Sequence, residues 1–351
     1  MEGIQGLKSD PISTTITTME KKREYWIDVL RCFACVMVLF CHAPAPDNAK
    51  SMIGTAFGMV NAYLGMAWGP VLFFMISGAC VLWGGQDSAR VFFKKRFSRV
   101  LCPTIVWSVV YVLLEQYVWK TNVSSVSHKL LMIPFAPQYG LLWFMYVIIA
   151  IYLVTPIFSV WLERCSKKDL QLYLAIWAIT LLFPYVRVSQ PEISSGLMSG
   201  NGLLYYFGGW MWVAVFGYYC RRYVNIQLRV WHYTLILIVP LSVLAFKLLS
   251  GETITNCLSI ASVFATAYAF VIIQNTSFKG VLRKQVEVFS KYSFGIYLCH
   301  MLFIHPFRIW ISQFGFDSYI QIPITVIVCG TCTYLLVWLI SKLPFSKYII
   351  G

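Results

Sequence analysis

Ten long apolar stretches constrain the fold of this chain more than any other feature of its sequence. Of its 351 residues, 59% are hydrophobic and 12% are charged, whereas a soluble domain carries about 25% charged residues. A run of about 18 or more apolar residues can cross the hydrocarbon core of a bilayer as a helix. The stretches lie near residues 25–45, 55–83, 98–119, 140–162, 170–187, 203–220, 230–249, 256–275, 292–312 and 319–341. We therefore predict an all-α fold, a polytopic membrane helix bundle of about ten transmembrane helices.

The basic residues give this bundle a direction. With ten spans, 21 of the 28 Lys and Arg residues fall on one side of the membrane and six on the other, and Arg31 lies inside the first span. Cytoplasmic loops carry such an excess, so we expect both termini in the cytoplasm. We divide the chain into a cytoplasmic tail over 1–24, a transmembrane domain over 25–342 and a short cytoplasmic tail over 343–351. Because the net charge of +14 is spread over many short loops, it predicts no nucleic-acid partner.

The first span carries three ionisable side chains, Asp28, Arg31 and His42. Each costs about 2.5–3.5 kcal/mol at membrane depth, so such residues indicate a function unless a structural partner explains them. Asp28 precedes Arg31 by three residues and can pair with it on the helix surface. Arg31 and His42 share one face, but their axial separation of about 16 Å is too large for contact. The alternative is an ion pair and a histidine that both lie at the membrane interfaces.

The eleven cysteines predict neither a disulfide framework nor a metal site. Their number is odd, and they are scattered through the apolar stretches. Cys32 with Cys35, and Cys329 with Cys332, have the spacing of a redox or metal motif. On a helix, however, residues three apart are neighbours on one face, and cysteine is a common small core residue. We interpret both pairs as packing.

Five motifs, in order along the chain, resemble those of one family of membrane proteins. They are Tyr-Trp-Ile-Asp-Val-Leu-Arg at 25–31 followed by His42, Phe-Phe-Met-Ile-Ser-Gly at 73–78, Lys-Arg-Phe-Ser-Arg at 95–99 with Pro103, Leu-Trp-Phe at 142–144 with Tyr152 and Pro156, and Ser-Phe-Gly-Ile-Tyr-Leu-Cys-His at 293–300. The family is the acyltransferase-3 family of integral membrane O-acyltransferases, and the resemblance covers most of the chain. Within it, the chain is similar to the stand-alone O-acetyltransferases of the enterobacterial-common-antigen type.

The resemblance implies a multi-pass enzyme of the bacterial inner (cytoplasmic) membrane, surrounded by membrane lipids. Such an enzyme moves an acyl group, here an acetyl group, from cytoplasmic acyl-CoA to a hydroxyl of a cell-surface or lipid-linked glycan. Acetyl-CoA is then a co-substrate, and no permanently bound cofactor is expected. A transporter or flippase of a small molecule or glycolipid, with no chemistry of its own, is the alternative, because several spans and buried charge would suit it equally.

The resemblance also gives the charged residues of the first and third spans a purpose. His42 would act as general base or as acyl carrier, with Asp28 and Arg31 as the other catalytic residues. The phosphates of acyl-CoA would be bound by a basic set, which consists of Arg31, Lys95, Arg96 and Arg99. Guanidinium groups suit phosphates because they form bidentate, charge-assisted hydrogen bonds. The alternative for the basic set is its role in membrane topology.

Five further residues are expected to contact the substrate or to support those that do: Ser77, Glu115, Trp143, Tyr297 and His300. Each has an alternative. Ser77 and Gly78 suit close helix packing, Trp143 suits a core, and His300 suits a structural hydrogen bond. Glu115 could orient His42 or bind a sugar hydroxyl.

One position departs from the family pattern. Many relatives carry His immediately before the Leu-Trp-Phe motif, and this chain has Leu141 there. If that histidine contributes to catalysis in relatives, this chain must work without it.

Overall fold

The structure is a computed structural model, and it is helical throughout the part of the chain that it describes. That part comprises residues 23–45, 49–82, 88–121, 125–190, 192–193, 196, 204–235, 258–278 and 280–351, and it contains no strand. Most of the N-terminal tail predicted over 1–24 lies outside these residues. The predicted all-α class is confirmed.

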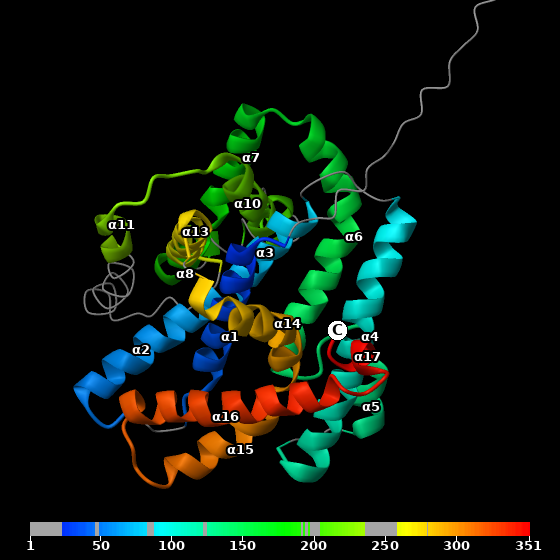
Figure 1. The fold of residues 1–351 in the computed structure, drawn as a ribbon, viewed down its shortest axis with the longest axis vertical. Helices are drawn as coiled ribbons and strands as arrows, with labels where there is room; N and C mark the ends of the chain where they lie inside the picture. The colour runs from blue at the N-terminus through cyan, green and yellow to red at the C-terminus, as the bar shows by residue number, and fades with distance from the viewer. Residues whose placement is uncertain are drawn as a thin grey trace, which may run out of the picture.

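The helices of the first half are α1 (Tyr25–His42), α2 (Met52–Met66), η1 (Ala67–Val71), α3 (Leu72–Val81), α4 (Ala89–Leu113), η2 (Leu114–Val118), α5 (Val126–Met132), η3 (Gly140–Leu142), α6 (Trp143–Arg164) and α7 (Lys167–Thr180). Those of the second half are α8 (Phe183–Ser189), η4 (Tyr205–Phe207), α10 (Trp210–Tyr223), α11 (Val230–Leu235), α13 (Ile260–Asn275), η5 (Gly280–Leu282), α14 (Arg283–Cys299), α15 (Met301–Ser312), α16 (Ser318–Ile340) and α17 (Ser346–Ile349). Figure 1 shows their arrangement.

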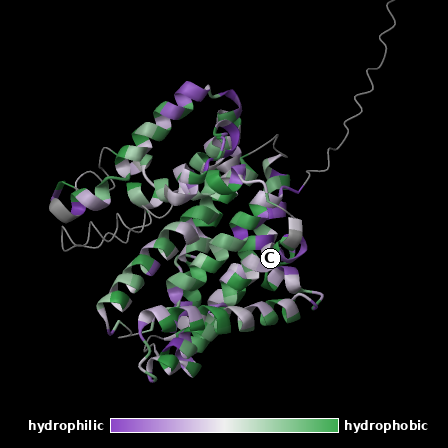
Figure 2. Cartoon of the chain, turned by 60° about the vertical axis from the view of Figure 1, so that its left-hand side comes forward, coloured by the Kyte–Doolittle hydropathy of each residue, from purple (hydrophilic) through white to green (hydrophobic). Residues whose placement is uncertain are grey.

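Six helical stretches in the described part are long and apolar enough to cross a membrane, and a seventh is counted if a bent pair is taken as one span. The six are Tyr25–His42, Met52–Val81, Ala89–Val118, Gly140–Arg164, Lys167–Arg187 and Ser318–Ile340, and the bent pair is Arg283–Cys299 with Met301–Ser312. Their outward faces carry exposed apolar side chains such as Ile157 and Ile327, and apolar residues run along most helices in Figure 2. The chain is therefore a polytopic helical membrane protein.

Three of the ten predicted spans have no counterpart of spanning length among the described residues. The stretch near 203–220 contains α10, which has 14 residues, and a helix of that length rises about 21 Å in a hydrocarbon core about 30 Å thick. The stretch near 256–275 contains α13, with 16 residues. The stretch near 230–249 lies largely outside the described residues, which include only α11 there. Against the ten predicted spans, the described part of the chain thus contains six or seven helices of spanning length.

The predicted ninth span, near 292–312, is not one straight helix. α14 and α15 meet at His300 and are bent by 64°. At the bend, the carbonyl oxygen of Tyr297 accepts a hydrogen bond from His300 Nδ1 (2.7 Å), and that of Leu298 accepts one from the Tyr111 hydroxyl (2.7 Å). Side chains that insert into the backbone ladder of a helix bend it. The expectation of a continuous helix was therefore wrong, and the bend fixes the position of the His300 ring.

α1 lies in the middle of the bundle, where it contacts α2, α3, α13, α14 and α16 (Figure 1). It ends at His42, two residues before Pro44, which cannot continue the helix. Cys32 and Cys35 donate their thiols to backbone carbonyls of α14, which supports the packing interpretation of that pair. No group of His, Cys, Asp or Glu suited to a metal ion occurs among the described residues.

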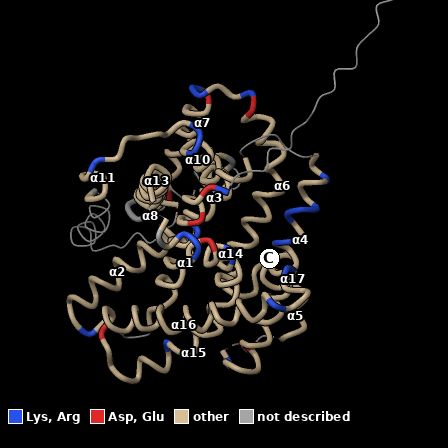
Figure 3. Tube along the Cα trace, viewed as in Figure 1, with Lys and Arg blue, Asp and Glu red and all other residues tan. Residues whose placement is uncertain are grey.

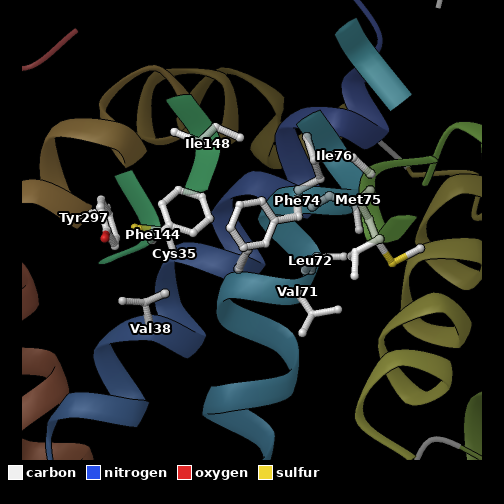
Figure 4. Close-up of a cluster of buried hydrophobic side chains, with 14 of the residues drawn as sticks. Cys35, Val38, Val71, Leu72, Phe74, Met75, Ile76, Phe144, Ile148 and Tyr297 are labelled. Carbon is white, nitrogen blue, oxygen red and sulfur yellow. The ribbon is translucent and has the colours of Figure 1, made fainter. Parts of the chain in front are cut away.

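The tightest helix contact holds α3 against α10. A Cβ atom added to Gly78 would lie 1.8 Å from the carbonyl oxygen of Ala214, and one added to Gly217 would lie 2.1 Å from that of Met75. Only glycine permits this approach of two backbones, as in many membrane helix pairs. Next to the contact, Phe74 and its neighbours form the core that Figure 4 shows between α1, α3 and α6.

Candidate functional site

The carboxylate of Asp28 is the most completely paired charge on α1. It accepts Arg23 Nε at 2.6 Å and the Ser290 hydroxyl at 2.6 Å, and Arg31 Nη1 lies 3.7 Å away. The side chain of Asp28 is 2% exposed, against 39% for Arg31. The hydrogen bond with Asp28 raises the pKa of Arg23 above its ordinary value. The pairing of Asp28 with Arg31 that their spacing predicts is therefore present, and Asp28 also ties α1 to α14.

Arg31 opens onto a cavity of about 260 Å³ that brings together residues from all five sequence motifs. Its polar and charged lining consists of Arg31, Ser77, Arg96, Arg99 and Ser293, from α1, α3, α4 and α14. Phe144, Ile148 and Tyr152 of α6 add an apolar wall. Three of the four residues predicted to bind phosphate thus line one space.

The fourth predicted phosphate ligand, Lys95, lies in an adjoining basic cavity of about 720 Å³. Arg96 and Arg99 line both cavities, and Lys347 of α17 adds another positive charge to the second. Figure 3 shows basic residues where α4 meets α17. The Arg96 guanidinium lies 6.0 Å from the ring centre of Tyr152, a distance typical of a cation–π contact. The two cavities together form a wide basic entrance to a narrower, partly apolar space.

Ser77 and Gly78 have different surroundings although they are adjacent. Gly78 packs against the backbone of Ala214, as the packing interpretation predicts. Ser77 lines the smaller cavity, and its hydroxyl oxygen is buried without a hydrogen-bond partner. A buried polar group that lacks a partner costs about 1–3 kcal/mol, so this hydroxyl is free to bind a polar group in the cavity.

Two aromatic residues lie between this cavity and the opposite end of α1. Phe144 lines the cavity, and its ring centre lies 5.2 Å from that of Tyr297. The Tyr297 ring in turn lies 6.1 Å from that of His300. Figure 4 shows Phe144 and Tyr297 beside α1. The Tyr297 hydroxyl donates to the carbonyl oxygen of Leu141 at 2.5 Å, so the backbone of Leu141 holds Tyr297 in place.

At that opposite end, the structure brings His42 and His300 together. Their ring centres are 5.1 Å apart, and His300 Nε2 lies 3.4 Å from His42 Nδ1. His300 is fully buried, and His42 is half-buried. The sequence does not predict this contact, because 258 residues separate the two histidines.

Backbone carbonyls determine where the protons of the two rings lie. His42 Nδ1 is 2.9 Å from the Val38 carbonyl oxygen, and His300 Nδ1 is 2.7 Å from that of Tyr297. A carbonyl oxygen only accepts, so both Nδ1 atoms carry a proton in the neutral rings. Nε2 of His300 is then an acceptor that faces the Nδ1 proton of His42. Nε2 of His42 keeps its lone pair and has no hydrogen-bond partner among the described residues.

Glu115 forms an ion pair, whereas Trp143 packs among aromatic side chains. Glu115 lies on η2 and accepts a 2.6 Å bond from Lys129 Nζ, so its carboxylate is already neutralised. Trp143 packs on Trp210, with ring centres 5.2 Å apart, and on Phe74 at 6.3 Å, as the core interpretation predicts. A role of either residue in substrate binding stays a prediction.

Arg308, on α15, is a residue of this region that the motifs do not include. It lies within electrostatic range of His42, and its Nε is buried without a hydrogen-bond partner. The sequence contains a signal for it, because Arg308 is one of only six basic residues on the predicted outer side.

Comparison with protein families finds a match over nearly the whole chain. A family model described as an acyltransferase domain, of the acyltransferase-3 type, matches residues 24–342. Comparison with curated proteins and with solved structures found no match in either case.

Proposed function

Because the chain belongs to the acyltransferase-3 family and is thus a membrane acyltransferase, we propose that it is an O-acetyltransferase that uses cytoplasmic acetyl-CoA. The acceptor is a hydroxyl of a cell-surface or lipid-linked glycan. We place the protein in a bacterial inner membrane, among the stand-alone enzymes of the enterobacterial-common-antigen type. The observation that carries the proposal is the division of α1, which has a cavity lined by guanidinium groups at one end and an imidazole pair at the other.

The basic entrance suits the charged end of acetyl-CoA. Arg96, Arg99, Lys95 and Lys347 supply the positive charge, and guanidinium groups bind phosphate oxygens through paired hydrogen bonds. The narrower cavity, with Arg31 and the unpartnered hydroxyl of Ser77, then holds the neutral pantetheine arm. Asp28 orients Arg31 and joins α1 to α14, so we assign it a positioning role.

The thioester reaches the other end of α1. Arg31 and His42 are separated by about 16 Å along the helix axis, and an extended arm covers such a separation where a side chain cannot. Phe144 and Tyr297 lie along this route. A shift of these two rings opens the way to His42.

The free lone pair on His42 Nε2 then serves as the base in acyl transfer. His42 Nε2 takes the proton of the acceptor hydroxyl, and the hydroxyl oxygen attacks the thioester carbonyl carbon. The bond between that carbon and sulfur breaks, and the coenzyme A thiolate takes the proton back from the imidazolium. The Val38 carbonyl oxygen accepts the Nδ1 proton of His42 at 2.9 Å, and His300 Nε2 lies 3.4 Å from the same atom as a second, weaker acceptor. These acceptors orient the ring and keep its proton on Nδ1, so that Nε2 is the basic nitrogen.

A second route uses His42 as an acyl carrier. In that route Nε2 attacks the thioester carbonyl carbon, the carbon–sulfur bond breaks and the thiolate leaves. The acceptor hydroxyl oxygen then attacks the acetyl carbon, the carbon–nitrogen bond to the imidazole breaks, and the hydroxyl proton goes to the coenzyme A thiolate. The two routes differ in one observable, because only the second leaves labelled acetyl on the protein when the acceptor is absent.

Transfer of label tests the proposal. Membranes that contain the protein are incubated with acetyl-labelled acetyl-CoA, and label is measured in the glycan lipids. We expect transfer with the wild type and with His128→Ala, which changes an exposed histidine of α5, and transfer lowered by about 100-fold or more with His42→Ala. Full transfer by folded His42→Ala would contradict the mechanism, and a transporter without chemistry would move no label in any variant.

A further inference from the structure

Arg308 is a cation that the described part of the chain leaves unpaired. It is half-buried on α15, and its Nε atom is buried without a hydrogen-bond partner. None of the ion pairs between described residues includes it. A guanidinium group offers five N–H donors and no acceptor, so a buried Nε–H without an acceptor carries a free-energy penalty. A ligand that supplies an acceptor removes this penalty.

Arg308 lies near His42, the residue that we propose as the general base. It lies within electrostatic range of His42 on α1, of Tyr139 before η3 and of His305 on its own helix. It therefore belongs to the His42 end of α1, whereas Arg31, Arg96 and Arg99 line the cavity at the other end. The donor phosphates and Arg308 thus occupy separate places.

Among the described residues, no group in this neighbourhood neutralises Arg308. Glu115 is the acid within electrostatic range of both Tyr139 and His305, but its carboxylate is bound by Lys129 at 2.6 Å. The side chains of that pair are only 16% and 13% exposed, so solvent screens the pair weakly. Burial raises the pKa of Tyr139 to about 12, so this phenol is neutral near pH 7. Among the described groups of this neighbourhood, the positive charge of Arg308 has no counter-charge.

Aromatic side chains lie in the same region as Arg308. The ring of Trp119 lies 4.3 Å from that of His305, and Tyr139 is stacked on Tyr111 at 4.3 Å. The π-helical turn η2 presents Trp119, and Lys120 after it has a φ of +52°. Such turns are frequent at functional sites. Aromatic faces with a few polar groups are typical of small-molecule sites, and they suit the apolar face of a sugar ring.

We propose that Arg308 binds an oxyanion of the acceptor, a carboxylate or a phosphate, beside the hydroxyl that His42 deprotonates. The inference rests on the proposed function and adds the substrate class, an anionic glycan. The oxyanion belongs either to an acidic sugar or to a phosphate carried by the sugar. Both present two oxygens to the guanidinium fork, which binds them through paired hydrogen bonds.

Three ligands that share one sugar ring test this inference. Phenyl β-glucoside is neutral, phenyl β-glucuronide carries a carboxylate at C6, and the 6-phosphate of phenyl β-glucoside carries a phosphate there. Their binding to the full-length protein in nanodiscs is measured by calorimetry. We expect at least one anionic ligand to bind about tenfold or more tightly than the neutral one, as one charge-assisted contact provides. The preferred anion distinguishes a carboxylate from a phosphate.

Variants assign the preference to one residue. Arg308→Gln should reduce the anionic preference to within about twofold, and Arg308→Lys should keep part of it, because a lysine retains the charge but not the fork. Arg187→Gln changes an exposed arginine of α8 and should keep all of it. Arg96→Ala with Arg99→Ala should keep it as well, which excludes binding of the ligand anion at the donor cavity.

Two results would overturn the assignment. One is equal binding of all three ligands by the wild type, and the other is equal weakening of all three by Arg308→Gln. Label transfer from acetyl-CoA separates this outcome from a failure of the proposed function. If His42-dependent transfer occurs and the ligands bind alike, only the role of Arg308 is wrong, whereas absence of transfer from wild-type membranes refutes the enzyme itself.

Discussion

The two ends of α1 differ in whether their ionisable side chains have partners within the protein. At the first end, Asp28 is surrounded by donors, with Arg23 and the Ser290 hydroxyl at 2.6 Å and Arg31 at 3.7 Å. At the second end, His42 Nε2 has a free lone pair, and Arg308 has no partner among the described residues. The difference separates charge that stabilises the fold from groups that are left available to a substrate.

A buried charge needs a partner, and the partner can be the protein or a ligand. Asp28 shows the first case, because its donors come from the preceding turn, its own helix and α14. Arg308 shows the second case. Substitutions at the two ends should therefore change different measurements.

The largest effect is expected at the imidazole end. His42→Ala removes the general base and should lower kcat by about 10²–10⁴-fold, while the KM for acetyl-CoA stays near that of the wild type. Initial rates of label transfer by purified protein measure both values. A kcat within tenfold of the wild type would exclude His42 as the base.

The next effect is expected at the basic entrance. Arg96→Ala together with Arg99→Ala removes charge-assisted hydrogen bonds to phosphate and should raise the KM for acetyl-CoA by about 10–100-fold with little change in kcat. High salt should weaken donor binding by the wild type in the same direction. Arg164→Ala, at an exposed arginine of α6, is the control. A reduced kcat at unchanged KM would show that the pair does not bind the donor.

A smaller effect, on stability, is expected at Asp28. Asp28→Ala leaves the Ser290 hydroxyl and the Arg23 guanidinium without their acceptor and Arg31 without its ion-pair partner, and should lower the free energy of unfolding by about 1–3 kcal/mol. Denaturant unfolding in detergent micelles measures it. Glu287→Ala breaks the more exposed pair with Arg283, and such pairs contribute about 0–1 kcal/mol. Equal losses in the two variants would show that Asp28 is not a special anchor of α1.

The smallest effect is expected at Ser77. Ser77→Ala removes one neutral hydrogen bond to the donor, which contributes about 0.5–1.5 kcal/mol, and should raise the KM for acetyl-CoA by about 2–12-fold. The thermal stability of the protein should not fall, because this hydroxyl has no partner within the protein. Gly78→Ala next to it should instead reduce the yield of folded protein, since its Cβ would clash with the backbone of Ala214. A loss of stability in Ser77→Ala with unchanged KM would assign the residue to packing.

Much of the fold follows from the sequence, because local patterns decide where a membrane helix starts and stops. Hydropathy alone gives the bounds of α1, α6 and α16 to within a few residues. The bend at His300 does not follow from it. One of the side chains that interrupts the ladder, Tyr111, comes from α4, and no pattern within residues 292–312 contains that information.

The same division applies to the candidate site. Helical periodicity places Arg31 and His42 on one face, and the motif order brings Arg96 and Arg99 into consideration. Three arrangements depended on the packing of separate helices: the shared cavity of Arg31, Ser77 and Arg99, the contact of His42 with His300, and the place of Arg308 within electrostatic range of His42. Arg308 lies outside every motif, and its place on the predicted outer side gives it no specific role, so its role is inferred from its neighbours in the packed bundle.

The sequence by itself determined that this protein is a helical membrane protein with an acid, a guanidinium group and an imidazole along its first helix, because hydropathy and helical spacing are local properties. The tertiary structure decided which of these groups are satisfied. Asp28 has its partners on α1, on α14 and in the residues just before α1. His42 has His300 next to one ring nitrogen and a free lone pair on the other. Whether a polar group is paired depends on atoms distant in sequence, and only the packed bundle brings those atoms within hydrogen-bond distance.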